Sequence, residues 1–96
     1  MRFEFKPSFE DSIKRFSAAD KAGIKEVACK IIDILSQDKF LYKGIGLKRL
    51  TGDYWEVRKG RKVRIIFRWN KDLVEFILAG NHSDIKRYLR RQSNAR

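Results

Sequence analysis

The chain has 96 residues, of which 43% are hydrophobic and 12% aromatic, and 23 Lys and Arg against 12 Asp and Glu give a net charge of +11. This composition allows one domain with a modest apolar core and excludes a wholly disordered chain. No apolar run approaches the ~18 residues of a membrane span, and the frequent charges of the first eleven residues are unlike a signal peptide. We therefore expect a single domain over residues 1–96, with no membrane contact, in the cytoplasm.

The sequence has one cysteine, Cys29, and one histidine, His82. One residue of each type excludes an internal disulfide and the zinc sites that are built from several Cys or His ligands. Cys29 is expected to be an inert thiol within a helix. We therefore expect neither a metal nor a cofactor.

The positive charge is concentrated in the second half of the chain. Residues 1–40 hold 8 basic and 7 acidic side chains, residues 41–68 hold 9 and 2, and residues 69–96 hold 6 and 3. A small basic domain most often binds a polyanion, and in the cytoplasm this is most often nucleic acid. The alternatives are an anionic membrane surface, an acidic protein partner, or a charge that serves only solubility.

The first half of the sequence predicts a strand and two helices. Residues 2–6 alternate between apolar and charged side chains, as a half-buried strand does, and Pro7 ends that strand. Ser8 is predicted to cap a short helix, and Ser17 or Asp20 to open a longer one. Both helices carry apolar residues three or four positions apart, namely Phe9, Ile13, Phe16, Ile24, Val27, Ala28, Ile31 and Leu35.

The second half predicts an antiparallel meander and a last helix. Residues 37–46 form a connection, residues 47–50 a short extended segment, and residues 54–79 three alternating strands joined by two short turns. Ser83 is predicted to cap the last helix. The fold class is therefore α+β, with an N-terminal strand and two helices packed on the meander and a short C-terminal helix. The sheet face under the two early helices is predicted to carry Trp55, Val57, Val63, Ile65, Phe67, Val74, Phe76 and Leu78.

The opposite face of the predicted sheet gathers charged side chains. The register of the first hairpin places Arg58 opposite Arg64. Two neighbouring arginines repel one another unless an anion lies between them, and the planar guanidinium matches the geometry of a phosphate. Glu56 lies within one pleat and could accept a proton. His82 follows the third meander strand and is the residue type whose ordinary pKa lies closest to neutral pH.

These side chains around a basic groove suit a metal-independent ribonuclease. RNA carries its own nucleophile, the 2′-hydroxyl, so the protein must remove that proton, stabilise the phosphorane and protonate the leaving 5′-oxygen. DNA lacks this hydroxyl and would be spared. Further basic side chains are expected to contact the RNA, namely Lys48, Arg49, Arg61, Lys62, Arg68 and Arg87.

Each of these side chains also has an ordinary interpretation. Charged residues are normal on the solvent face of a sheet, and Glu56 beside Arg58, or Glu75 beside Arg64, can form a surface ion pair worth ~0–1 kcal/mol. A lone histidine at a strand end is more often a surface or capping residue than a catalyst. An exposed Arg64 could be removed at little cost in stability. Only the convergence on one face favours a catalytic site.

Two segments resemble a known family. Residues 47–69, LKRLTGDYWEVRKGRKVRIIFRW, are similar to the RelE/ParE superfamily of bacterial toxins from toxin–antitoxin pairs, and residues 79–88, AGNHSDIKRY, are similar to the closing segment of that family. The family pattern falls on Leu50, Gly52, Trp55, Glu56, Val57, Arg58, Val63 and Arg64.

The resemblance implies a compact domain like the microbial ribonucleases, which cuts mRNA in the ribosomal A site and is neutralised by a cognate antitoxin. Position by position, Arg64 resembles the central catalytic Arg of the family, and Arg58 resembles the basic residue of the preceding strand. His82 and Tyr88 resemble the closing Arg/His and Tyr positions. RelE has a lysine where Glu56 stands, so the identity of the general base stays open. The alternatives are a gyrase-poisoning toxin of the ParE branch, which binds its target without catalysis, and an inactive homologue that only binds an antitoxin.

Overall fold

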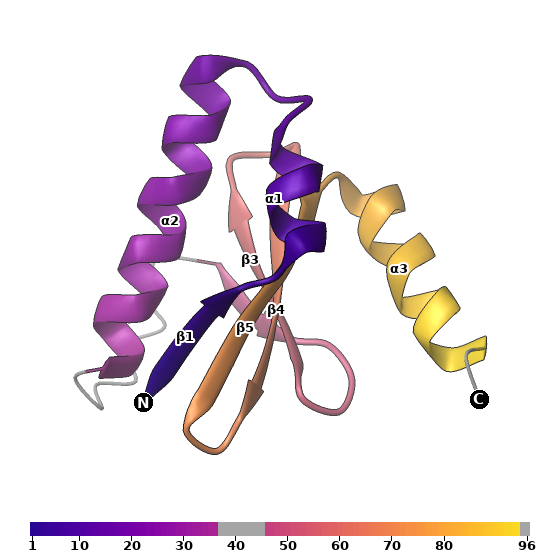
Figure 1. Ribbon diagram of the computed structural model, residues 1–96. Helices are drawn as coiled ribbons and strands as arrows, with labels where there is room; N and C mark the ends of the chain where they lie inside the picture. The colour runs from indigo at the N-terminus through magenta and orange to yellow at the C-terminus, as the bar shows by residue number, and fades with distance from the viewer. Residues whose placement is uncertain (37–45, 95–96) are drawn as a thin grey trace.

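The computed structural model describes residues 1–36 and 46–94. Along the chain it contains β1 (Arg2–Phe5), α1 (Pro7–Ile13), α2 (Ala18–Ser36), β2 (Leu47–Arg49), β3 (Tyr54–Lys59), β4 (Val63–Asn70), β5 (Leu73–Gly80) and α3 (His82–Asn94) (Figure 1). The predicted α+β order is confirmed, while nearly all of the predicted connection over residues 37–46 lies outside the described residues. Of the helices described here, none has the length and apolar content to cross a membrane.

The strands form one five-stranded sheet in the order β1-β5-β4-β3-β2. Strands β2 to β5 pair antiparallel, which confirms the predicted meander. Strand β1 pairs parallel with β5, with Phe3 opposite Val74. The N-terminal strand therefore forms one edge of the sheet, next to the strand that leads into α3.

Helix α1 continues along the same edge where β1 ends. The Ser8 hydroxyl donates a hydrogen bond to the Ile77 carbonyl at 2.6 Å, and the Ser12 hydroxyl accepts one from the Ala79 N–H at 2.9 Å. These two bonds satisfy backbone groups of β5 that a longer edge strand would otherwise pair. The prediction that Ser8 caps α1 is wrong, because the cap residue is Lys6, which makes no side-chain cap bond.

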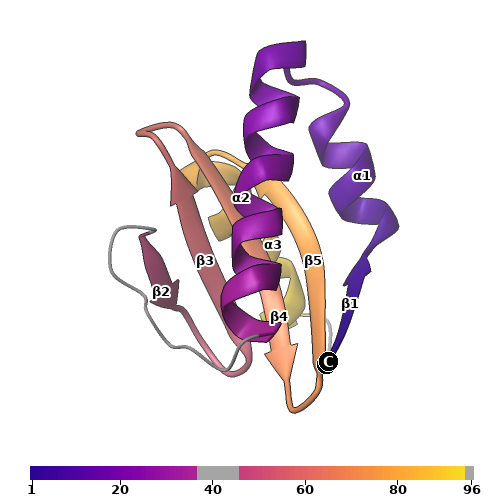
Figure 2. The same ribbon diagram turned by 90° about the vertical axis from the view of Figure 1, so that its left-hand side faces the viewer.

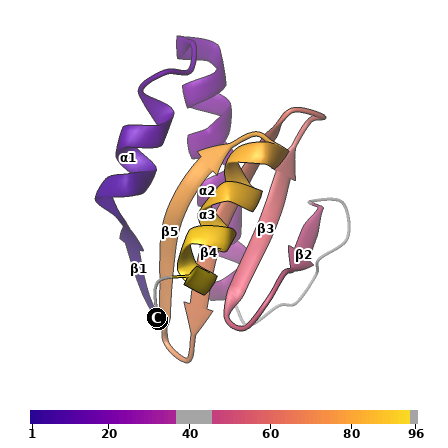
Figure 3. The ribbon, with the colours of Figure 1, turned by 90° about the vertical axis from the view of Figure 1, so that its right-hand side faces the viewer.

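The two longer helices lie on opposite faces of the sheet. Helix α2 lies in front of the sheet in Figure 2, and α3 lies in front of it in the opposite view of Figure 3. Ser17 caps α2, as predicted, by accepting a hydrogen bond from the Asp20 N–H at 3.2 Å. The sheet therefore has an α2 face and an α3 face, and both are partly covered.

The main core lies on the α2 face. Its buried members are Phe9, Ile24, Ala28, Ile31, Leu35, Val57, Ile65, Phe67, Val74, Phe76 and Ala79, with Trp55 and Val63 packed against them. Both early helices contribute to it, as predicted.

One residue of the predicted core is wrong, and a β-bulge explains why. Ile66 pairs with Leu78 whereas Phe67 pairs with Phe76, so Ile77 is an extra residue in β5. A bulge reverses the alternation of side chains beyond it. Leu78 therefore turns to the α3 face, and Ala79 takes its place in the core. On the α3 face a second, smaller cluster buries Ile66, Ile77 and Ile85.

Candidate active site

Two arginines lie side by side on the α3 face, as the sequence predicted. Arg58 in β3 is the cross-strand partner of Arg64 in β4. Arg58 is exposed, whereas the Arg64 side chain is 22% exposed and donates a hydrogen bond through Nη1 to the Glu56 carboxylate at 3.0 Å. Glu56 therefore holds Arg64 in place while Arg58 stays open to solvent.

Glu56 is the one charged residue that the described structure buries, with a side chain only 5% exposed. Its cross-strand partner in β4 is the buried Ile66. The expectation of an ordinary surface ion pair is therefore wrong for Glu56. The premise that Arg64 is exposed is also wrong, since its side chain is only 22% exposed and pairs with this buried carboxylate, so we expect its removal to cost stability.

Glu75, a second carboxylate of this face, is bound elsewhere. It lies 2.7 Å from the Lys6 amine and 4.0 Å from Arg68, and its register partner is Arg68 rather than Arg64. The hydrogen bond to Glu75 raises the pKa of Lys6. Glu75 therefore connects the start of α1 to the far end of β4 and takes no part in the Arg58–Arg64 pair.

His82 is the first residue of α3 and is exposed. It lines a cavity of about 600 Å³ together with Arg61 and Lys62 from the turn between β3 and β4. The same cavity includes Arg15 but not Arg64. His82 therefore emerges at the predicted end of the sheet, and it shares its cavity with cations of the turns and with the carboxylates of Asp20 and Asp84.

The start of α3 is fixed by Asn81 rather than by Ser83, so the predicted cap is wrong. The Asp84 N–H donates to Asn81 Oδ1 at 2.8 Å, and the Asn81 N–H donates to Asp84 Oδ2 at 3.0 Å. This reciprocal pair is a capping box in which Asp takes the usual place of Glu. A Cβ at Gly80 would lie 2.7 Å from Asp84 Oδ2, so a glycine is required where β5 meets α3.

Tyr88 is a residue of α3, and its ring packs edge-on against Tyr54 with the ring centroids 6.1 Å apart. Burial, followed by a hydrogen bond with Tyr54, raises the pKa of the Tyr88 hydroxyl. Tyr88 lies six positions after His82, which is about 9 Å along a helix axis. The structure therefore brings Arg58, Arg64 and Glu56 together and leaves His82 and Tyr88 apart from one another.

The residues predicted to contact RNA are all exposed, but they do not form one patch. They divide between β2, the β3–β4 turn, the far end of β4, and α3: Lys48 and Arg49, Arg61 and Lys62, Arg68, and Arg87. Within residues 1–36 and 46–94, no group of three or more His, Cys, Asp or Glu side chains could hold a metal ion.

No protein-family model matches the chain, and no curated protein is detectably similar to it in sequence. Solved structures nevertheless align over most of it. YafQ from E. coli strain BL21(DE3) is 12% identical with a TM-score of 0.65, over 88% of this chain and 96% of YafQ. A chain of the RelB–RelE antitoxin–toxin complex from Methanococcus jannaschii is 20% identical with the same TM-score, over 88% of this chain and 95% of that one.

This chain has the fold of the RelE-like toxins. The YoeB/ParE toxin from Agrobacterium tumefaciens adds a third match, 19% identical with a TM-score of 0.60, over 85% of this chain and 99% of that one. At these identities the RelE-like fold is what the chain shares with these proteins. The fold predicted from the resemblance is thus confirmed.

The RelE-like fold places two further charged groups beside His82, and sequence reasoning assigned a site role to neither of them. Arg15, in the turn after α1, forms an ion pair with Asp84 in α3 at 2.7 Å, although 69 positions separate them. Asp84 had a local signal, since it stands three residues after the capping Asn81. Arg15 had none, because only the docking of α1 along β5 brings it there.

Proposed function

We propose that this protein is the toxin of a toxin–antitoxin pair. We propose further that it is an endoribonuclease that cuts mRNA on the ribosome. The observation that supports this most is the Arg58–Arg64 pair on adjacent strands, with Arg64 held by the buried Glu56. A guanidinium that is already oriented loses little conformational freedom when it binds the phosphate. It can therefore stabilise the charge of the transition state without first being ordered. The RelE-like fold supports the same assignment.

In the proposed reaction the 2′-oxygen of the RNA attacks the adjacent phosphorus, and the proton of the 2′-hydroxyl passes to a water molecule. The bond to the 5′-oxygen then breaks, which leaves a 2′,3′-cyclic phosphate and a free 5′-hydroxyl. Arg64 and Arg58 bind the non-bridging oxygens, whose charge grows in the phosphorane. Glu56 acts as a positioning residue, since its carboxylate is buried against Arg64.

His82 is the proposed general acid for the leaving 5′-oxygen. It is exposed at the head of α3 and its ring is free to approach a substrate that lies over the end of the sheet. Tyr88 is the proposed second candidate for the acid. Its hydroxyl carries a proton at neutral pH, as an ordinary tyrosine does, and burial together with the hydrogen bond to Tyr54 raises its pKa further.

The proposed protein partner is a cognate antitoxin. YafQ has been solved in complex with DinJ, and the Methanococcus jannaschii structure holds RelE together with RelB. Both complexes pair a protein of this fold with an antitoxin. We extend that pairing to this chain as part of the proposal.

A second function is favoured by one observation. His82 and Tyr88 lie about 9 Å apart along α3. A toxin that inhibits DNA gyrase by binding needs no acid–base pair. We therefore propose non-catalytic gyrase inhibition as the second function.

The experiment that separates the two functions is induction of the chain in bacteria, with and without Arg64→Lys. This substitution keeps a cation beside Glu56 and removes the planar fork. Primer extension on a translated reporter mRNA should show discrete cuts with the wild type and few with the variant. Intact mRNA together with trapped DNA breaks would overturn the ribonuclease and establish the gyrase inhibitor.

A further inference from the structure

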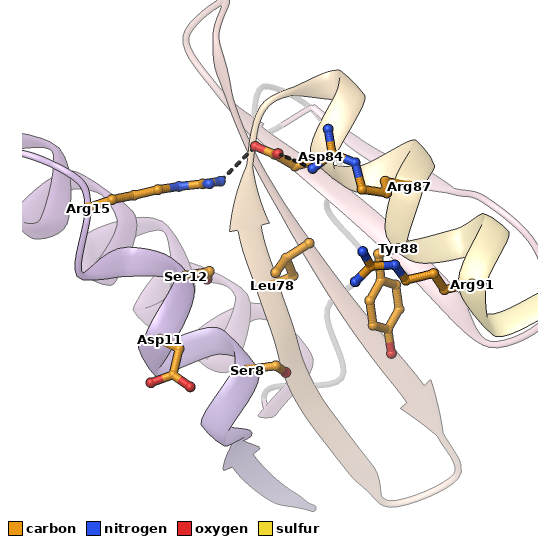
Figure 4. A pocket seen from close by; sticks show the side chains of 9 residues that line it. All are labelled: Ser8, Asp11, Ser12, Arg15, Leu78, Asp84, Arg87, Tyr88 and Arg91. Carbon is orange, nitrogen blue, oxygen red and sulfur yellow. Dashed lines mark hydrogen bonds and ion pairs between the residues drawn. The ribbon is translucent and has the colours of Figure 1, made fainter. Parts of the chain in front are cut away.

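A charged groove lies between α1 and α3 over β5, whereas Arg58 and Arg64 belong to β3 and β4. Its volume is about 380 Å³, and we call it the α1–α3 groove. Leu78 of β5 lies between the two helices, Arg15 projects from the turn after α1, and Arg87, Tyr88 and Arg91 project from α3 (Figure 4). Arginines from two distant segments of the chain thus border the same depression.

The cations of the groove are only partly neutralised. Asp84 accepts Arg15 at 2.7 Å and Arg87 at 3.5 Å, and it also accepts the Asn81 N–H of the capping box. Among the described residues Arg91 has no ion pair or hydrogen bond. The second acid of the groove, Asp11, is paired with Lys14 at 3.1 Å. One carboxylate therefore serves two arginines, and a third arginine is left without a counter-charge.

The groove continues into the cavity of His82. Arg15 and Asp84 line both depressions, so their ion pair stands at the point where the two meet. A polymer that passes over the head of α3 at His82 can therefore lie against Arg15, Arg87 and Arg91 without leaving the surface. An unrelated ligand would not need this continuity.

We propose that the α1–α3 groove binds backbone phosphates of single-stranded RNA that flank the cut. The ligand class rests on the proposed function, and the three arginines of the groove take no part in the proposed reaction. Arg87 and Arg91 are one helical turn apart, about 6 Å along the axis. Each therefore reaches a different phosphate of an extended strand, while the guanidinium forks match phosphate oxygens. The exposed face of Leu78 and the ring of Tyr88 suit the sugars and bases between them.

The test is the binding of a fluorescein-labelled 2′-O-methyl oligouridylate, measured by fluorescence anisotropy on the full chain. This probe lacks the 2′-hydroxyl and is not cut, so its binding does not depend on the chemistry. The variant pair is Arg87→Gln with Arg91→Gln. The matched control is Lys86→Gln with Arg90→Gln, which removes the same charge from exposed positions of the same helix that do not line the groove.

We expect the Arg87 and Arg91 pair to weaken binding about tenfold, and to reduce the slope of log affinity against log salt by about 1.4, since each phosphate contact to a single strand contributes about 0.7. The control should change affinity less than about twofold, because only long-range attraction is lost. Arg91→Gln alone should show half of the change in slope. It removes a side chain with no partner in the described structure, so it carries the test if the double variant fails to fold.

Equal weakening by both pairs would mean unspecific attraction and would overturn the groove. Unchanged oligouridylate binding together with lost binding of a polyglutamate peptide would make it a site for an acidic protein segment, which also overturns the proposal. If the wild type cuts no RNA but the two variant pairs differ in binding as expected, the groove is supported and the ribonuclease proposal is overturned. If the wild type cuts RNA but the two variant pairs bind alike, the ribonuclease is supported and the groove proposal is overturned.

Discussion

The two faces of the sheet are built from the same strands, but one is apolar and the other carries charged groups. On the α2 face, side chains from α1, α2 and every second strand position form one continuous apolar core. On the α3 face, a small cluster around Ile66, Ile77 and Ile85 covers only part of the sheet, and charged groups occupy the rest. The α2 face can thus carry most of the stability, which leaves the α3 face free to hold arginines in positions that cost stability and bind anions.

The stability of the two faces can be compared with one substitution on each. Ile24→Ala on α2 should cost about 4 kcal/mol and Ile85→Ala on α3 about 2 kcal/mol, opposite ends of the ~2–5 kcal/mol range for such changes. Both side chains are buried, but Ile24 belongs to the large cluster and Ile85 to the small one. Urea unfolding of the two variants measures the difference. Equal costs would show that α3 is as integral to the fold as α2.

His82 tests whether the head of α3 takes part in the chemistry. His82→Gln keeps a hydrogen-bonding side chain of similar size and removes the titratable proton, so cleavage should slow by about 10²-fold. The unfolding midpoint should stay unchanged, because the side chain is exposed. Single-turnover cleavage across pH 5 to 9 is the measurement. A wild-type rate throughout would leave His82 a surface residue, and Tyr88 would be the next candidate for the acid.

Glu56 and Glu75 are two carboxylates on the α3 face and serve as each other's control. Glu56→Gln should lower kcat about tenfold with little change in KM, because Arg64 loses the charge that orients it before the transition state forms. Glu75→Gln should leave kcat unchanged, since Glu75 pairs with Lys6 and Arg68. Steady-state cleavage kinetics of both variants provide the comparison. An equal fall in both would reduce Glu56 to a general stabiliser of the sheet.

The smallest expected effect concerns Tyr88 and alkaline pH. Its pKa is higher in the folded protein than in the unfolded chain, where tyrosine titrates near 10. The contribution to stability is therefore complete below about pH 10 and is lost as pH rises above it, because the unfolded chain releases the proton first. Tyr88→Phe should lose less stability than the wild type between neutral pH and about pH 10.5, as urea midpoints at both pH values would show. If the stability of both proteins fell equally with pH, the pKa of Tyr88 would not be raised in the folded protein.

The meander and its arginine register were predictable because they depend on local pattern. Period-two alternation over residues 54–79 and a short turn around Gly60 suffice to place Arg58 opposite Arg64. The Ser17 cap of α2 is equally local. These features need no knowledge of distant parts of the chain.

What the sequence did not reveal depends on contacts between distant segments or on a single irregularity. The bulge at Ile77 has no residue signature, and it reversed the assignment of Leu78 and Ala79. The burial of Glu56 accompanies the docking of α3 on a face that alternation alone marks as exposed. The Arg15–Asp84 pair joins residues 69 positions apart. Tertiary packing therefore decided the surroundings of most site residues, whereas local pattern decided which face they share.

The most direct test of the account is the single-turnover rate at which purified protein cuts mRNA on ribosomes, with Arg64→Lys compared with Arg2→Lys. Arg2 lies on β1 and its side chain is 77% exposed, so the control makes the same chemical change far from the Arg58–Arg64 pair. We predict that Arg64→Lys stays folded and cuts about 10²-fold more slowly, because a lysine cannot present two parallel donors to the phosphorane, while Arg2→Lys cuts at the wild-type rate. A folded Arg64→Lys variant that cuts as fast as the wild type would contradict the central claim that the arginine pair on the α3 face is the catalytic site.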